Sequence, residues 1–194
     1  MVKTASTMLP LSAAAPGFSL PNVLDDSIVT LKDFDNKRGL LVMFVCNHCP
    51  FVVHVRKELA QFGKDYRDRN VGIVAISSND AESYPDDTPA KLKEMATRLG
   101  FTFPLLYDES QKVAIAYSAA CTPDFFLFNE QRRLIYRGQL DGSRPGNDIP
   151  VTGSDLRQAL DAFLEGRDID PNQKPSIGCN IKWKPGNEPD YFKA

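Results

Sequence analysis

The sequence has little of what marks membrane-spanning, fibrous or disulfide-rich proteins. No stretch approaches the roughly 20 consecutive apolar residues that a membrane span needs. Only four of the 194 residues are cysteine, which is far below the density of a secreted disulfide scaffold. The formal net charge of −2 gives no positive field that would attract nucleic acid or anionic lipid. These absences predict a soluble globular protein with no membrane and no nucleic-acid partner, acting on small molecules or other proteins.

The chain is long enough to bury a sizeable core within a single domain. Residues 1–12 lack the sustained apolar core of a signal peptide, and we expect them to be a short disordered leader. Residues 13–165 contain the periodic segments and form the predicted domain. Residues 166–194 are rich in proline and are predicted to be an extended arm packed on the same domain. The cysteine usage further predicts a cytoplasmic location.

Hydrophobic periodicity predicts alternating strands and helices. Residues 39–45 and 71–77 are continuous apolar runs, which are typical of strands buried on both faces. Gly100 is the expected end of one helix, and Ser154 is the expected cap of another. We expect strands over 28–31, 39–45, 71–77, 103–106, 125–128 and 134–140, and helices over 51–62, 90–99, 109–117 and 154–164. Their order predicts an α/β fold with a mixed central sheet flanked by helices.

Two cysteines separated by two residues stand between the strand at 39–45 and the helix at 51–62. Cys46 and Cys49 can close a disulfide if both lie in one turn. We expect Cys46 at the helix N-terminus, where free N–H groups and the helix dipole favour its thiolate, which is the attacking form. Cys49 is expected one turn in, more buried, to resolve the mixed disulfide. Pro50 follows at a position where its missing N–H is harmless.

The turn between the two cysteines holds Asn47 and His48. A protonated imidazole at His48 would stabilise the thiolate of Cys46 and make the disulfide more oxidising, by about 30 mV per 1.4 kcal/mol. Replacing His48 by alanine is then expected to make the pair more reducing. The alternative is that His48 only faces solvent, as we expect for His54 on the following helix.

A metal-binding module carrying zinc or copper on Cys46, Cys49 and His48 is one alternative to redox chemistry. A structural zinc site usually shows a second close-spaced pair of ligands. The two remaining cysteines, Cys121 and Cys179, are 58 residues apart in the sequence. We therefore favour redox chemistry and expect no bound metal.

The segment Cys121-Thr122-Pro123 opens a predicted strand far downstream of the CxxC turn. A strand, a CxxC turn and a helix, followed later by such a proline, resemble the thioredoxin superfamily, in which a cis-proline faces the CxxC motif. The resemblance implies a thioredoxin-like fold in which Pro123 takes that place and Thr122 precedes it. It also implies that the backbone beside Pro123 is free to pair with an extended substrate, as an added strand would.

More narrowly, the chain resembles the redoxin branch, which includes alkyl hydroperoxide reductase and thiol-specific antioxidant proteins. The resemblance covers residues 13–165 and is carried by 15–18 (APGF), 103–108 (FPLLYD) and 122–128 (TPDFFLF). The tail 175–184 (PSIGCNIKWK) is similar to that of an uncharacterised thioredoxin-like subgroup. This resemblance implies exchange with protein or small-molecule disulfides, or reaction with peroxides, with a thiol as reductant and no cofactor.

One departure from the peroxidases of this branch concerns the residues before the first cysteine. Peroxiredoxins carry Pro-x-x-x-(Thr/Ser)-x-x-Cys, whereas this chain has Gly39 and Met43 at the first two of these positions. The hydroxyl that activates peroxide is therefore absent from that position. A thiol peroxidase that uses the CxxC pair in a non-standard way remains an alternative, with weak activity expected.

A second departure concerns proton transfer. Thioredoxin has an acidic proton acceptor six places before its first cysteine, and this chain has Leu40 there. The proton of Cys49 must then go to His48, to Asp124 or to water. The residues alone leave these three alternatives open.

The other two cysteines are either small core residues or secondary thiols that exchange with the redox pair. Cys121 lies two residues before Pro123, which the fold would place near the pair. In the arm, Ile177, Cys179, Ile181 and Trp183 alternate with other residues, so an extended arm would point all four side chains the same way. We expect residues 175–184 to pack on the domain with Cys179 turned inward, close to Cys121 or to the CxxC pair.

Overall fold

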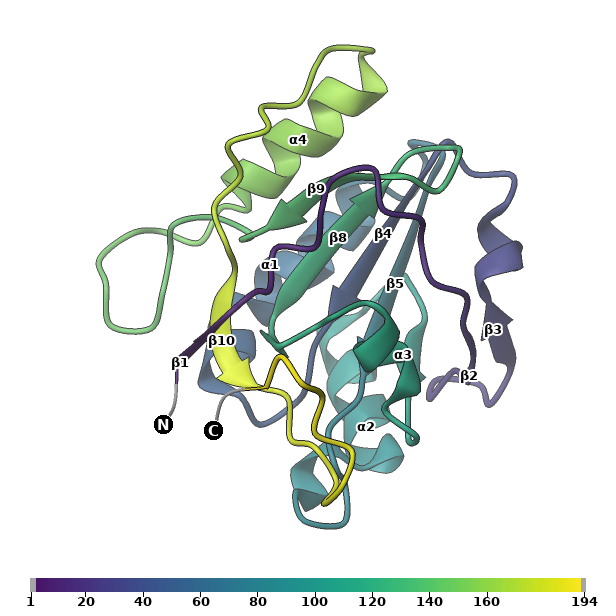
Figure 1. Cartoon of the computed structure of the whole chain (residues 1–194), viewed down its shortest axis with the longest axis vertical. Coiled ribbons are helices and arrows are strands. Elements are labelled where there is room, and N and C mark those ends of the chain that lie inside the picture. The colour runs from purple at the N-terminus through teal and green to yellow at the C-terminus, as the bar shows by residue number, and fades with distance from the viewer. Residues whose placement is uncertain (1–2, 193–194) are drawn as a thin grey trace.

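The computed structural model describes residues 3–192, and its centre is a five-stranded mixed sheet (Figure 1). The strand order is β6-β5-β4-β8-β9. Strand β4 pairs in parallel with β5 and antiparallel with β8, which continues into β9 as a hairpin. The bounds are Gly39–Phe44 for β4, Val71–Ser77 for β5, Leu105–Tyr107 for β6, Asp124–Phe128 for β8 and Leu134–Gly138 for β9.

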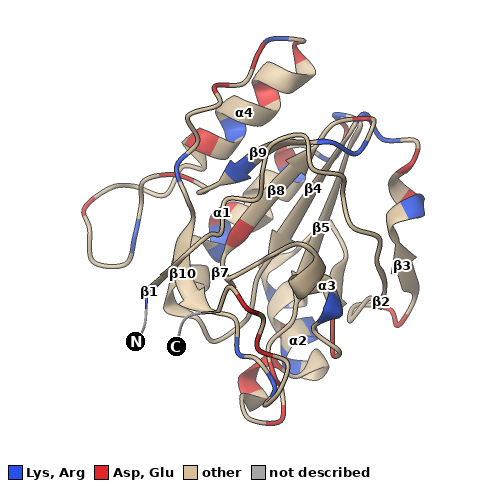
Figure 2. Ribbon diagram, in the orientation of Figure 1, with Lys and Arg blue, Asp and Glu red and all other residues tan. Residues whose placement is uncertain are grey.

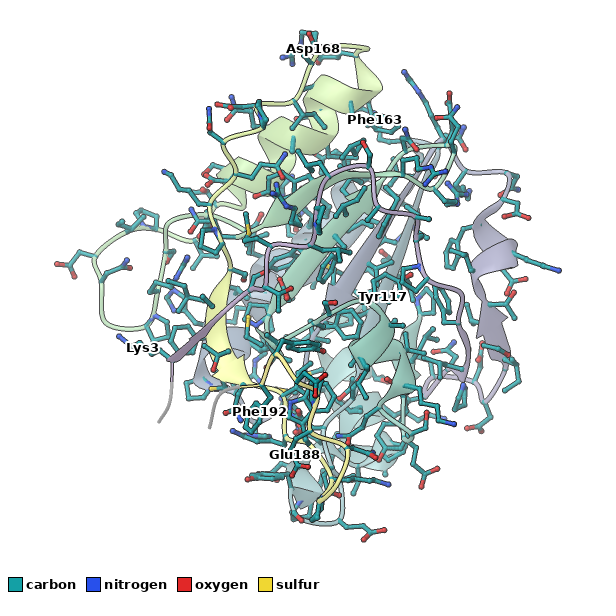
Figure 3. All side chains as sticks on the ribbon, viewed as in Figure 1. Lys3, Tyr117, Phe163, Asp168, Glu188 and Phe192 are labelled. Carbon is teal, nitrogen blue, oxygen red and sulfur yellow. The ribbon has the colours of Figure 1, made fainter. Side chains whose placement is uncertain are left out.

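Helices and short strands cover both faces of this sheet. The apolar side chains of α1 (Pro50–Asp65), α2 (Pro89–Leu99) and α4 (Ser154–Leu164) share one core cluster with one face. The other face packs on α3 (Lys112–Ala116) and on the hairpin of β2 (Ser19–Pro21) and β3 (Ile28–Thr30). Tyr117, labelled beside α3 in Figure 3, is buried there against three phenylalanine rings. Because both faces are covered, β4 and β5 are buried along their whole length.

The mixed α/β architecture predicted from the sequence is confirmed, with differences at element ends. Strand β2 was not predicted, because Pro16 and Pro21 make its segment read as a loop. Strand β6 begins two residues later than expected, after Pro104, whose nitrogen has no hydrogen to donate. The expected cap at Ser154 is wrong, because the N-cap residue is Gly153 in a left-handed conformation. Gly100 ends α2 as predicted, with a φ of 68°.

The N-terminal segment does not match the expected disordered leader. Residues Lys3–Ala5 form strand β1, which pairs antiparallel with β10 (Ile177–Asn180) in the C-terminal arm. On its other edge, β10 pairs with β7 (Cys121–Thr122), so the three strands form a second sheet (Figure 1). The prediction of disorder is therefore wrong for residues 3–12, whereas residues 1 and 2 lie outside the described residues. The leader's sequence is too short and polar to show periodicity, and its order comes from the partner strand.

The C-terminal arm packs on the domain in extended form, as its alternating pattern predicts. Cys179, Ile181 and Trp183 are buried, and Ile177 is half-buried. Beyond β10, the Lys182 backbone N–H donates to the Asn79 side chain at 2.8 Å. In Figure 3, Lys3 marks β1 beside this arm and Phe192 marks the end of the tail.

Charged residues of both signs are dispersed over the surface in Figure 2, in agreement with the small net charge. Within residues 3–192, no helix has both the length and the apolar character to cross a membrane.

Candidate active site

The candidate redox pair lies where β4, α1, β7 and β10 meet. Cys46 follows β4, and Cys49 immediately precedes α1. The Thr122 hydroxyl oxygen lies 3.2 Å from the Cys46 sulfur, and the Cys49 thiol donates to the Thr122 carbonyl at 3.2 Å. The Thr122–Pro123 bond is cis, as the resemblance implied. The structure therefore brings together Cys46, Cys49, Thr122 and Pro123 from segments more than 70 residues apart in sequence.

The helix begins within one residue of its predicted start, but the CxxC turn precedes it, so Cys49 and not Cys46 lies at its N-terminus. Cys49 is the N-cap residue of α1, Pro50 is in the first turn as predicted, and Cys46 lies three residues before the cap. The two cysteines are equally buried, so the expectation that Cys49 is more buried than Cys46 is wrong. The favourable helix terminus proposed for Cys46 therefore belongs to Cys49 in the structure.

The surroundings of Cys46 and Cys49 shift the pKa values of the two thiols in opposite directions. The Cys179 and Cys46 thiols, as hydrogen-bond donors, lower the pKa of Cys49 well below its usual range when that sulfur becomes an acceptor. Burial, followed by the interaction with Cys49 and by the charge of Asp87, raises the pKa of Cys46 well above its usual range. The directions of the two shifts favour Cys49 over Cys46 as the thiolate, and when Cys49 is protonated its thiol donates to the Thr122 carbonyl.

The two additional cysteines have different relations to the pair. Cys179 lies directly opposite Thr122 in the pairing of β10 with β7, and it belongs to the same core cluster as Cys49, which raises the pKa of Cys179. Cys121 instead contacts backbone carbonyls, those of Pro123 at 3.8 Å and Ser176 at 4.0 Å. The prediction that Cys179 turns inward toward the CxxC pair is confirmed, whereas Cys121 is a buried thiol held against backbone.

His48 is fixed by a carboxylate that the sequence analysis did not identify. Its Nδ1 lies 2.6 Å from Oδ2 of Asp87, a buried residue of the short 3-10 turn η2 (Pro85–Asp87). Oδ1 of Asp87 accepts the backbone N–H of Asn47 at 2.7 Å, and Oδ2 also accepts the Asn79 amide. Asp87 thus holds the turn between the cysteines. The available signal was positional: β4 and β5 are parallel neighbours, so the loop after β5 reaches the edge where Cys46 follows β4.

The His48 ring lies between this carboxylate and an aromatic ring. It stacks on Tyr84, with ring centroids 5.3 Å apart and an interplanar angle of 11°. The hydrogen bond to Asp87 raises the pKa of His48, while partial burial opposes the shift. Burial acts to raise the pKa of Asp87, but its bonds from His48 and Asn79 bring the pKa below its ordinary value. The pair is therefore an imidazolium and a carboxylate on the acidic side of neutrality. His54, expected on the surface, is half-buried and within 2.7 Å of the Ser143 hydroxyl.

We expect Asp87→Asn to lower the pKa of His48. A raised His pKa contributes stability that is fully present below the unfolded-state pKa near 6.5 and is lost as pH rises through the folded pKa. The variant should therefore lose stability mostly between about pH 4 and 6.5, the window in which both groups are charged. NMR titration of the His48 ring protons measures the pKa. Asp86→Asn removes the same charge from an exposed neighbour and is the matched control. An equal shift in both variants would contradict a specific pair.

The structure also changes the set of residues that could bind a metal ion. The described residues that come closest to a ligand set are Cys46, His48 and Asp87, whose ligand atoms lie within 4.8 Å of one another. Cys49 is replaced in that set by Asp87. Both Asp87 oxygens already accept hydrogen bonds, and Oδ2 lies at hydrogen-bond distance from the His48 nitrogen that would bind the metal. This arrangement fits a carboxylate that orients an imidazole.

Asp124, one of the three predicted proton acceptors, is fully buried. Burial raises the pKa of Asp124 to about 8, although the Ser6 side chain and the Phe125 N–H lower it. At neutral pH the group is therefore mainly protonated and is poorly suited to accept the proton of Cys49. Burial raises the pKa values of Cys121 and Tyr191, and the ionised form of Asp124 raises them further.

A mixed sheet, helices on both faces, a CxxC turn between strand and helix and a facing cis-proline define the thioredoxin fold. Solved thioredoxin-like structures that are 18% identical superpose on 80% of the chain with TM-scores of 0.64 and 0.61, and share this fold. The chain belongs to the redoxin family, whose model matches residues 10–159.

Two solved structures resemble nearly the whole chain. An uncharacterized conserved protein from Geobacillus kaustophilus is 55% identical, covering 96% of this chain and 98% of that one, with a TM-score of 0.94. A hypothetical protein from Sinorhizobium meliloti 1021 is 49% identical, covering 94% and 100%, with a TM-score of 0.92. The thiol-disulfide oxidoreductase ResA of Halalkalibacterium halodurans is 22% identical over 112 residues, which are 58% of this chain and 59% of that protein. The match to this curated relative thus spans about three fifths of its length.

Proposed function

We propose that the protein is a thiol–disulfide oxidoreductase whose redox pair is Cys46 and Cys49. The observation that carries the proposal is the meeting of both sulfurs at Thr122, each within 3.2 Å of an atom of this residue. In the mechanism, a thiolate attacks a substrate disulfide and forms a mixed disulfide. The second cysteine of the pair then displaces the substrate thiol and closes Cys46–Cys49. The attack by Cys46 in particular stays a prediction, since the directions of the pKa shifts favour the thiolate on Cys49.

The electrostatics around the pair support this chemistry. The thiolate is the nucleophile in disulfide exchange, and the lowered pKa of Cys49 provides one at neutral pH. The imidazolium of His48, held by Asp87, adds positive charge next to it. The oxidoreductase activity in the name of the ResA relative points to the same reaction class.

The burial of the pair favours small disulfides and thiols over folded proteins as direct substrates. Neither Cys46 nor Cys49 is exposed to solvent. The edge of β7, which the resemblance implied to be free for an incoming strand, is occupied by β10 of this same chain. An extended protein segment can pair there only after the arm has left. The thiol that acts as reductant must likewise be small enough to reach the buried pair. The cytoplasmic location of the protein stays a prediction.

The structure supplies one hydroxyl near Cys46 that could assist a peroxidase, but not the residues with which peroxiredoxins orient a peroxide. The Thr122 hydroxyl lies 3.2 Å from the Cys46 sulfur, so a hydroxyl does approach this cysteine from another element. Gly39, in contrast, lies at the start of β4, at the opposite end of the strand from Cys46, and Met43 is buried in the core. Neither can orient a peroxide at Cys46.

Redox titration of the purified protein tests the proposal. In a series of dithiol buffers, the protein should take up two electrons in one transition, and peptide mapping should identify a Cys46–Cys49 disulfide. The Cys121→Ala variant is the control and should titrate identically, since the Cys121 thiol donates its hydrogen bonds to backbone carbonyls. A pair that stays reduced in strongly oxidising buffers would refute the function. Rapid reaction of the reduced protein with hydrogen peroxide would instead favour the peroxidase.

A further inference from the structure

The C-terminal arm places a third cysteine against the redox pair through strand pairing. Cys179 is the residue of β10 opposite Thr122, the residue that contacts both Cys46 and Cys49. All three cysteines belong to one core cluster. On its other edge, β10 pairs with β1, where Cys179 lies opposite Lys3. The position of Cys179 is therefore set by main-chain hydrogen bonds on both sides.

The close approach of the arm depends on the residue before Cys179. A Cβ atom on Gly178 would lie 2.0 Å from the Thr122 carbonyl oxygen and 2.6 Å from its carbon. Real Cβ atoms essentially never come so close to backbone, so only glycine permits this contact. The absence of a side chain at Gly178 lets the backbone of β10 press against Thr122, which brings Cys179 to the redox pair.

From this geometry we propose that Cys179 is a third redox-active thiol, which attacks the Cys49 sulfur of the oxidised pair and transfers the disulfide to Cys49–Cys179. The proposal rests on the proposed function, because it needs the Cys46–Cys49 disulfide as its starting point. Through this exchange, electrons from an external thiol would reach the Cys46–Cys49 disulfide, which is closed to solvent.

The order of the three sulfurs suits this exchange. The thiols of Cys46 and Cys179 both act on the pKa of Cys49, so Cys49 is the cysteine common to both interactions. Among the described residues, the only three ligand groups with all atoms within 4.8 Å of one another are Cys46, His48 and Asp87. The three cysteine sulfurs are therefore not all within 4.8 Å of one another, and the exchange that we propose runs through Cys49 as the central sulfur. Thiol–disulfide exchange requires a nucleophile, a central sulfur and a leaving sulfur in such an order.

The step is balanced without any outside oxidant. The Cys179 sulfur forms a bond with Cys49, the Cys46–Cys49 bond breaks, and Cys46 leaves with the electron pair. The proton released by Cys179 goes to Cys46, which holds it because burial raises the pKa of Cys46. Two molecules of an external thiol then complete the cycle. The first forms a mixed disulfide with Cys179 and releases Cys49, and the second releases Cys179 as a thiol and leaves as the disulfide.

Exposure decides which sulfur meets that external thiol. Cys46 and Cys49 have no exposed surface, whereas Cys179 is 5% exposed. Cys179 is thus the one residue of the three with any exposed surface, although it is buried like the other two. Cys121 is also completely buried and has no sulfur among its hydrogen-bond partners, which makes it the matched control for Cys179.

The full-length protein and three single variants test the proposal. On oxidation with diamide, the Cys46→Ala variant should form a Cys49–Cys179 disulfide, which peptide mapping after rapid acid quenching identifies. In the Cys179→Ala variant, the Cys46–Cys49 disulfide should still form, but its reduction by glutathione should be slower by about tenfold or more, since a positioned thiol is lost. The Cys121→Ala variant should behave like the unchanged protein in both measurements.

Separate outcomes distinguish this inference from the proposed function. If the unchanged protein does not form Cys46–Cys49, the function fails. If that disulfide forms, but Cys46→Ala yields no Cys49–Cys179 disulfide and Cys179→Ala is reduced at the normal rate, the third thiol is refuted. The fluorescence of Trp183, the single tryptophan, reports whether the arm of each variant is still docked.

Discussion

Replacing Cys49 by serine should abolish thiol–disulfide exchange, with a loss on the order of 10³-fold or more, because a hydroxyl does not replace a thiolate nucleophile. The loss should exceed that of Cys46→Ser. Cys49 is the sulfur shared by both disulfides, Cys46–Cys49 and Cys49–Cys179, whereas the Cys46 variant retains the second pair. A colorimetric assay with a small aromatic disulfide, which enters a closed site more easily than a protein, measures the rate.

The control for Cys49→Ser is Cys121→Ser, which places the same substitution at a buried cysteine without a sulfur partner. Its rate should stay close to that of the unchanged protein, provided that its melting temperature shows a folded domain. If Cys49→Ser retained a tenth of the normal rate or more, the active sulfur would lie elsewhere. If Cys46→Ser were the more damaging of the two, the attack on substrate would belong to Cys46.

The elements that the sequence predicts well are those buried on both faces or carrying a full amphipathic period. Strand β5 has the predicted bounds of 71–77, and α4 the predicted bounds of 154–164. In both, local periodicity and final burial agree. Strand β1 was missed because three residues carry no period, and its order comes from β10, far away in the sequence. Strand β2, which pairs with the nearby β3, was missed because Pro16 and Pro21 give its segment the pattern of a loop.

The sequence predicts the site residues that lie in one short motif, but not those that only the folded topology brings to the site. Cys46, Cys49 and His48 stand in one short motif, and the stripe through Cys179 marks the arm as a packed strand. Asp87 gives no local signal, because its role arises only when the loop after β5 meets the turn after β4. Periodicity predicted the start of α1 to within one residue. It did not show that the CxxC turn lies outside the helix, which gives the helix N-terminus to Cys49.

The second substitution with a large expected effect lies in the C-terminal arm. We expect Gly178→Ala to detach β10 from β7, because even a methyl group would lie 2.0 Å from the Thr122 carbonyl oxygen. Detachment exposes Ile181 and Trp183, and each large apolar side chain contributes about 1.5–3 kcal/mol when buried. The melting temperature should fall by several degrees or more, and alkylation of Cys46 and Cys49 by iodoacetamide should become faster by about tenfold or more, as opening becomes easier.

The matched control for Gly178→Ala is Gly17→Ala. Nothing lies within 4 Å of the Cβ position at Gly17, and its φ is outside the positive range. Both substitutions reduce the flexibility of the unfolded chain in the same way, so this contribution cancels in the comparison. A Gly178→Ala protein with normal melting temperature and slow alkylation would show that β10 can shift without leaving β7. Fast alkylation together with slow reduction by glutathione would indicate that the displaced Cys179 no longer reaches Cys49, so that an open site alone does not replace the third thiol.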